Sequence, residues 1–288
     1  LGDHEKQVFQ ETLEIKAYTT QLKIISCLFI DCISQSEGGG IKSAAENANI
    51  FIQSTGFTKC RSSKTGGAFY LACKKFALQR CCISSCVADE SAAFYFTNKY
   101  ENTDEFQHTY VHDISPTSTA TNTIFIDSHE PNIQNINFSL IQQPSIQSVI
   151  EFQQFEGFTY RYTLFSMCKG TNLLYFNEIC DDTTIQFSNF DSTKASDAIF
   201  HLSKTKVLKI YSCSFMRDDS SKYSNQYSWY NGCYFDHPKD SDKFPYKDYQ
   251  VNCKFDSLYT TFNIFLDDEK ANGCWDFVSP IIPSDRTD

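Results

Sequence analysis

The sequence predicts an all-β protein folded as one right-handed parallel β-helix of about nine stacked coils. Two observations lead to this prediction. A short motif recurs along the 288-residue chain at intervals of 25 to about 30 residues, and a fixed period of about 20 to 50 residues is typical of stacked architectures. The composition also favours strands, because 26 Phe and 16 Tyr accompany many Ile, Thr, Ser and Asn, with only 2 Met.

The repeated motif reads apolar-x-apolar-x-x-small-x-Phe-x-x-Cys. It runs over residues 22–32, 50–60, 76–86 and 158–168, and a shortened copy covers 208–215. In a parallel β-helix every strand bonds to the equivalent strand of the next coil, so each motif position becomes a column of side chains. We therefore expect a ring column of Phe29, Phe57, Ile83, Phe165, Phe190, Phe215 and Phe255, and a column of small residues that contains Cys27, Cys81, Cys213 and Cys253.

Weaker copies of the motif centre on Leu140, Phe190 and Phe255, and one of uncertain register lies near His112. A second apolar segment follows each motif. In the first three coils small residues introduce this segment, and later coils keep apolar residues two positions apart, which places both on one face of a strand. The sequence therefore predicts a further wall of the solenoid after each motif, with glycines at the corner that precedes it.

The period divides the chain into an amino-terminal cap at 1–21, a β-helix at 22–266 and a closing cap or tail at 267–288. The interval between Phe215 and Phe255 grows to 40 residues, which predicts an insertion at about 216–247. Loops that project from a solenoid often make its contacts, and aromatic residues are enriched at interfaces. The candidate binding residues in this insertion are Trp229, Tyr230, Tyr234, Phe235, Phe244 and Tyr246.

The charge argues against one class of function. The net charge is -10 and the isoelectric point is about 5.1, whereas nucleic-acid binding depends largely on clustered Lys and Arg. We therefore expect no nucleic-acid partner. No apolar run reaches the length that a membrane-spanning helix needs, so we also expect no transmembrane segment.

Thirteen cysteines are many for a reducing cytosol, which favours an extracellular or cell-surface location. Because thirteen is odd, at least one thiol is unpaired within the chain. Disulfides between neighbouring coils and buried free thiols both fit the spacing. An intracellular, cytoskeleton-associated protein with reduced cysteines is the alternative.

Two elements of the repeat resemble a known family. Gly66-Gly67-Ala68-Phe69 is similar to the Gly-Gly-Ala-aliphatic element of the polymorphic outer-membrane proteins (Pmp) of chlamydiae and of similar trichomonad surface proteins. Their Phe-x-x-Asn element has its counterpart in Phe-x-x-Cys at 29–32, 57–60 and 165–168. The strong likeness covers residues 22–96. It implies a surface passenger with an adhesin-like role.

Pectin-lyase-like β-helices also include polysaccharide lyases and glycoside hydrolases, so an enzyme is the second hypothesis. Glycoside hydrolysis requires paired carboxylates at a defined separation. The best local cluster is Arg217, Asp218 and Asp219, in which an Arg base would lie beside acidic residues. His108 and His112 would lie far apart on a strand, which argues against a metal site there.

We expect a non-enzymatic β-helical surface or structural protein, acting as an adhesin-like interaction module or as a rigid component of an assembly. The expected partners are other proteins or surface glycans, and no cofactor is expected. The repeated Phe, Cys and Gly motif is thus interpreted as structural, because its positions form the inward columns and corners of the solenoid.

Overall fold

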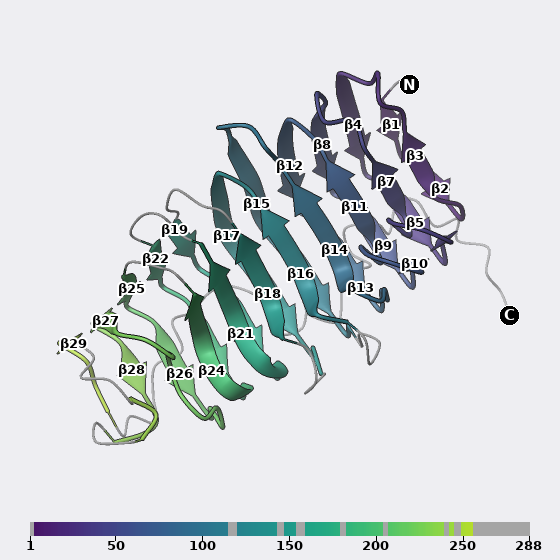
Figure 1. The fold of residues 1–288 in the computed structure, drawn as a ribbon. Helices are drawn as coiled ribbons and strands as arrows, with labels where there is room; N and C mark the ends of the chain where they lie inside the picture. Colours follow the sequence, from purple (N-terminus) through teal and green to yellow (C-terminus); the bar gives the residue numbers. More distant parts are fainter. Residues whose placement is uncertain are drawn as a thin grey trace, which may run out of the picture.

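The computed structural model describes residues 3–114, 120–142, 147–153, 159–178, 183–203, 207–238, 242–244 and 249–255. Within these residues it confirms an all-β fold in which parallel ladders build a β-solenoid. The coils follow one another along a rod, and the strands of each wall lie side by side (Figure 1). The eight strands of the third wall span about seven turns, which is close to the predicted nine.

Each complete coil contributes to three walls. The first wall contains β1 (His4–Glu5), β4 (Gln21–Ile25), β8 (Asn49–Gln53), β12 (Lys75–Gln79), β19 (Thr159–Arg161), β22 (Thr183–Gln186), β25 (Leu208–Tyr211), β27 (Ser228–Asn231) and β29 (Tyr249–Val251). The second wall contains β2 (Val8–Phe9), β5 (Leu28–Ile30), β9 (Gly56–Thr58), β13 (Cys82–Ser84), β20 (Leu164–Ser166), β23 (Asn189–Asp191), β26 (Ser214–Met216) and β28 (Tyr234–Phe235). The long strands β15 (Thr103–His112) and β17 (Glu130–Ser139) run through both.

The third wall is a separate sheet. It contains β3 (Leu13–Ile15), β7 (Ile41–Ser43), β11 (Phe69–Ala72), β14 (Ser91–Thr97), β16 (Asn122–Asp127), β18 (Ser148–Gln153), β21 (Lys169–Asn177) and β24 (Lys194–Ser203). A short ladder of β6 (Ile33–Ser34) and β10 (Arg61–Ser62) lies between the second and third walls in the early coils.

The corner between the first and second walls is made by one residue in the left-handed region. Ser54 (φ 49°) and Arg80 (φ 53°) are examples, and equivalent residues recur from coil to coil. The next residue points inward and bonds back to the corner: the Thr55 hydroxyl donates to the Gln53 carbonyl at 2.9 Å, and the Cys81 thiol donates to the Gln79 carbonyl at 3.3 Å. Cys, Thr and Ser share this position because each offers a small side chain with one donor.

The ring column lies in the interior of the second wall. Phe165 pairs in register with Phe190, and their ring centroids are 5.1 Å apart at 6°; Phe190 and Phe215 stack in the same way at 5.0 Å. The column also includes Val111 and Phe138, which the motif search did not identify. The weaker copies near His112 and Leu140 were therefore one and two residues out of register.

The glycines before the third wall occupy positions that no side chain fits. A Cβ on Gly67 would lie 2.2 Å from the Ala92 carbonyl oxygen of the next coil, and Gly66 has φ +74°. The backbones of neighbouring coils approach each other here, so the Gly-Gly-Ala element is explained by packing.

The two ends of the solenoid differ from the sequence expectation. Residues 4–15, expected as a cap, form strands β1, β2 and β3, which continue the register of the next coil. Within 216–247, expected as an insertion, β27 and β28 pair with β25 and β26, so that Phe235 lies opposite Phe215. The 40-residue interval is two coils of 20 residues. Between β26 and β27 the third wall is continued by an isolated bridge, Phe200 to Ser224, in place of a strand, which shortens the coil. Residues 267–288 lie outside the described residues.

The ring column predicts a large stability effect at its centre. Phe165 is 0% exposed and stacks on Phe138 as well as Phe190. Phe165→Ala should lower the free energy of unfolding by about 3–5 kcal/mol, because it leaves a cavity and removes two ring contacts. Urea denaturation measures this change, with Met167→Ala, which is 44% exposed in the same coil, as the control. Equal effects of the two substitutions would contradict the inward column.

Candidate functional site

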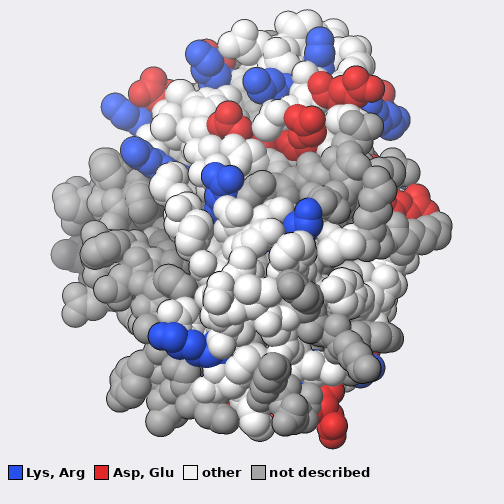
Figure 2. Space-filling view, turned by 90° about the vertical axis from the view of Figure 1, so that its left-hand side faces the viewer, with Lys and Arg blue, Asp and Glu red and all other residues white. Residues whose placement is uncertain are grey.

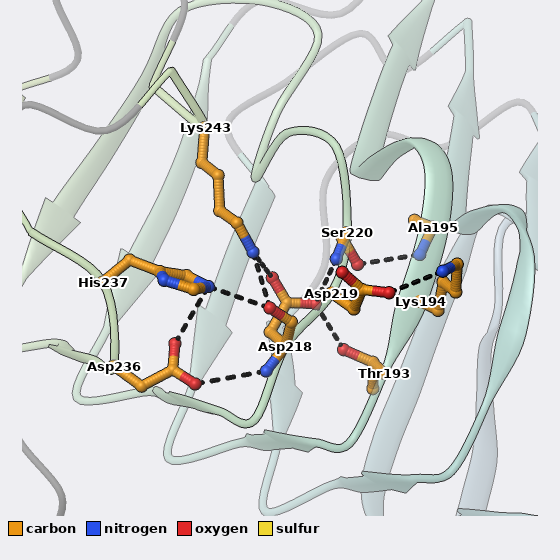
Figure 3. Close-up of polar contacts among 9 residues, drawn as sticks. All are labelled: Thr193, Lys194, Ala195, Asp218, Asp219, Ser220, Asp236, His237 and Lys243. Atoms are coloured by element: carbon orange, nitrogen blue, oxygen red, sulfur yellow. Dashed lines mark hydrogen bonds and ion pairs between the residues drawn. The ribbon is translucent and has the colours of Figure 1, made fainter.

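The predicted acidic cluster lies where the third wall ends. Asp218 follows β26 at the second corner, and its side chain is completely buried. One carboxylate oxygen accepts hydrogen bonds from the Thr193 hydroxyl at 2.9 Å and from the Ser220 backbone N–H at 3.1 Å (Figure 3). Asp218 thus ties its own coil to the preceding one.

The other Asp218 oxygen pairs with Lys243. The Lys243 ammonium lies 3.1 Å from this oxygen and donates to the Asp218 backbone carbonyl at 2.6 Å. The His237 ring nitrogen Nε2 lies 2.9 Å from the same carbonyl, and the Asp236 carboxylate accepts from the Asp218 backbone N–H at 3.2 Å (Figure 3). Both carboxylate oxygens are engaged within the chain, so Asp218 acts as a clamp between short coils.

Arg217 and Asp219 point to other partners. The Arg217 guanidinium makes a bidentate ion pair with Asp191 of the preceding coil, and this hydrogen bonding raises the pKa of Arg217. Asp219 is exposed and pairs with Lys194 at 2.5 Å; the hydrogen bond from Lys194 lowers the pKa of Asp219. The three residues of the alternative catalytic cluster therefore do not converge on a common space.

The aromatic residues expected on an insertion are divided between the interior and the surface. Tyr230 and Phe235 are 0% exposed, because they occupy inward positions of β27 and β28. Phe244 is partly buried and packs against the core. Trp229 and Tyr234 are half-buried on the outward side of the same strands. Tyr246 lies outside the described residues.

The cysteines are mostly buried free thiols. Ten described cysteines are free, including Cys27, Cys81, Cys213 and Cys253 of the predicted column, and Cys82 is disulfide-bonded. Burial raises the pKa of both Cys81 and Cys168 to about 12. Among the described residues, no group of three or more His, Cys, Asp and Glu side chains is arranged to hold a metal ion.

The outer face of the third wall carries a row of ring side chains that sequence reasoning missed. We define the outer aromatic row as Tyr70, Tyr95, Phe125, Tyr175 and His201, which share one register position in β11, β14, β16, β21 and β24. Glu151 holds this position in β18 and separates Phe125 from Tyr175, and Phe125 is buried whereas the other four rings are half-buried. The Tyr95 and Phe125 ring centroids are 4.5 Å apart at 7°, and those of Tyr175 and His201 are 4.9 Å apart. Each of these rings lies between two inward apolar residues, and that signal was present in the sequence.

A surface pocket of about 490 Å³ adjoins the amino-terminal end of this row. Tyr70 and Tyr95 line it together with polar residues of the loops that precede β7, β11 and β14. One of these residues, Glu37, accepts from Lys42 at 2.9 Å and from Lys64 at 3.3 Å. The hydrogen bond from Lys42 is the main reason that the pKa of Glu37 falls to about 2. Aromatic and charged groups thus meet in one open site.

Charges of both signs are mixed on the face that is seen when the solenoid is viewed from the side of β27–β29. In this view, basic and acidic side chains alternate along the upper part of the molecule and gather into no patch of one sign (Figure 2). A phosphate backbone requires a positive stripe, which this face does not present among its described residues.

The different surroundings of Asp218 and Asp219 predict that the same substitution changes stability to different extents at the two positions. Asp218→Asn should lower the free energy of unfolding by about 3 kcal/mol or more, because it leaves the Lys243 ammonium, 15% exposed, without its carboxylate. Asp219→Asn should change stability little, since the Asp219–Lys194 pair is exposed. Thermal and urea unfolding of both variants measures the difference. If Asp218→Asn left the free energy of unfolding unchanged, the role of Asp218 as a clamp between coils would be contradicted.

Thiol reactivity tests the burial of the cysteine columns. Because the thiolate is the reactive form, Cys81 and Cys168 should resist iodoacetamide in the native protein at about pH 8 and react after unfolding. Peptide mass mapping of alkylated protein, before and after addition of denaturant, gives the result. Rapid native labelling of either residue would contradict its inward position.

The part of the chain that the structure describes contains no helix of the length and apolar character needed to cross a membrane. Comparison with known proteins adds no relative: no family model matches the chain, and neither a curated protein nor a solved structure matches it.

Proposed function

We propose that this chain is a non-enzymatic β-solenoid of the cell surface or extracellular space that acts by binding, as an adhesin-like interaction module or as a rigid part of an assembly. The observation that carries this proposal is the outer aromatic row. The interior contains its own ring column, and four of the five rings of the outer row are half-buried on the opposite face of the third wall.

The outer aromatic row has the properties of a contact surface. Tyr and Phe present large, rigid areas at low cost in side-chain entropy, and aromatic residues are enriched at the centres of interfaces. The rings belong to paired strands, which place them one coil apart within the groups Tyr70–Tyr95–Phe125 and Tyr175–His201, on either side of Glu151. Extended solenoid faces are commonly used for binding. Such a surface fits other proteins as partners.

The surroundings of the alternative catalytic residues support binding over catalysis. A general acid or base needs access to a substrate atom. Asp218 is enclosed by Thr193, Ser220 and Lys243, and Arg217 is engaged by Asp191. These contacts explain the acidic cluster as a structural feature of the last coils.

Two observations support the proposed location. Cys82 is disulfide-bonded, and disulfides persist chiefly in oxidising environments. The resemblance of Gly66-Gly67-Ala68-Phe69 to elements of Pmp and trichomonad surface proteins points the same way. The ten free thiols favour the alternative, an intracellular, cytoskeleton-associated component. Microscopy of the native cell with antibodies, with and without permeabilisation, separates the two locations.

Binding by the outer aromatic row is tested on the cells or particles that produce the protein. Fluorescently labelled protein should bind their surface, and Tyr95→Ser combined with Tyr175→Ser should reduce this binding about tenfold or more. Tyr162→Ser is the control, because Tyr162 is 40% exposed at a corner between the first and second walls. Unchanged binding by the double variant would contradict the proposal. So would depolymerisation of an acidic polysaccharide that is lost in the Asp218→Asn variant.

A further inference from the structure

We propose that the pocket beside Tyr70 and Tyr95 binds a lysine side chain on a basic segment of a partner protein. This inference rests on the proposed function and names the partner chemistry for one end of the outer aromatic row. The pocket of about 490 Å³ lies between the outer face of the third wall and three successive loops, to which Glu37, Lys64 and the pair Asp89 and Glu90 belong.

The charges of the pocket are unbalanced toward the negative. Glu37, Asp89 and Glu90 carry three negative charges, against two positive charges on Lys42 and Lys64, which both pair with Glu37. Asp89 and Glu90 are exposed, and no cationic side chain of the described residues pairs with either. A ligand that enters the pocket therefore meets a net charge of -1 and two carboxylates that make no ion pair with a described residue, so a cation is the complementary group.

The tyrosines strengthen this preference. Burial raises the pKa of Tyr95 to about 12, and the negative charge of Glu90 adds to the effect. Burial and the charge of Glu37 also raise the pKa of Tyr70. Both hydroxyls thus stay protonated at neutral pH, next to the carboxylates of the pocket rim.

The arrangement of the rings favours lysine over a sugar. Tyr95 is stacked on both faces, by Tyr70 at 5.1 Å and by Phe125 at 4.5 Å. A pyranose needs an open ring face for its C–H groups, which Tyr95 does not offer. The aliphatic stem of a lysine can lie along stacked ring edges while its ammonium reaches the carboxylates at the rim.

The charge of the whole chain acts in the same direction. A net charge of -10 attracts basic segments from solution and raises the rate of encounter. This attraction alone gives no specific site. The specificity comes from the pocket, in which the ring edges of Tyr70 and Tyr95 lie together with the unpaired carboxylates of Asp89 and Glu90.

The test uses the full chain and a fluorescent hexalysine peptide, with binding followed by anisotropy at near-physiological salt. Asp89→Asn/Glu90→Gln should weaken binding about tenfold. The matched control, Glu101→Gln/Glu130→Gln, removes the same charge from two exposed residues that do not line the pocket, and it should weaken binding less than about twofold. Tyr70→Ser, verified as folded by urea denaturation, should also weaken binding without any change of charge.

Five results would overturn the inference. Equal losses in the two double variants would show a general charge effect, and unchanged binding in the pocket variant would exclude the site. Binding of neutral disaccharides such as cellobiose or lactose in the pocket, with no binding of hexalysine, would assign it to sugars. If the pocket variant still binds native cells while Tyr95→Ser/Tyr175→Ser does not, the lysine site fails and the proposed function stands. If neither variant loses cell binding, both fail.

Discussion

The whole structure depends on the in-register stacking of parallel coils. A coil satisfies its strand N–H and C=O groups only through the coils before and after it, at about 4.8 Å. Each inward side chain therefore lies on the equivalent side chain of its neighbours, as Phe190 lies between Phe165 and Phe215. A ring stacks best on a ring, and a thiol or hydroxyl follows the first corner in most coils, with Ile136 as an exception. The sequence repeats because equivalent positions of successive coils require similar side chains.

The same constraint separates structure from function in this molecule. The interior columns are fixed by the requirement that coils match, so a change at Phe165 or Cys81 is expected to act through stability. The outward positions carry no such requirement, and it is there that a row of rings and a charged pocket occur. Even Asp218, which sequence reasoning offered as a catalytic acid, belongs to the matching of coils, because it occupies a corner position and binds Thr193 of the preceding coil.

The fold could be predicted from the sequence because Phe, Cys and Gly mark the inward and corner positions directly. The surroundings of Asp218 could not, since Lys243 lies 25 residues away and the clamp depends on how two short coils are placed. The prediction for residues 216–247 was wrong because the third wall is reduced after β26 to a bridge between Phe200 and Ser224, which shortens the coil. The period therefore breaks while the first two walls continue, and Tyr230 and Phe235 look like loop aromatics although they are core residues. The outward direction of Tyr70 and Tyr95 could have been predicted, because each lies between two inward apolar residues of its strand. Strand alternation alone does not show that such rings stack.

The most direct test of this account is hydroxyl-radical footprinting of the native protein with residue-level mass spectrometry. The account predicts that Tyr70 and Tyr175 are oxidised while Tyr230 and Phe235 are protected until the protein unfolds, because the first pair faces outward and the second pair is enclosed. Oxidation of Tyr230 and Phe235 as fast as that of Tyr70 would contradict it, and would return residues 216–247 to an exposed loop.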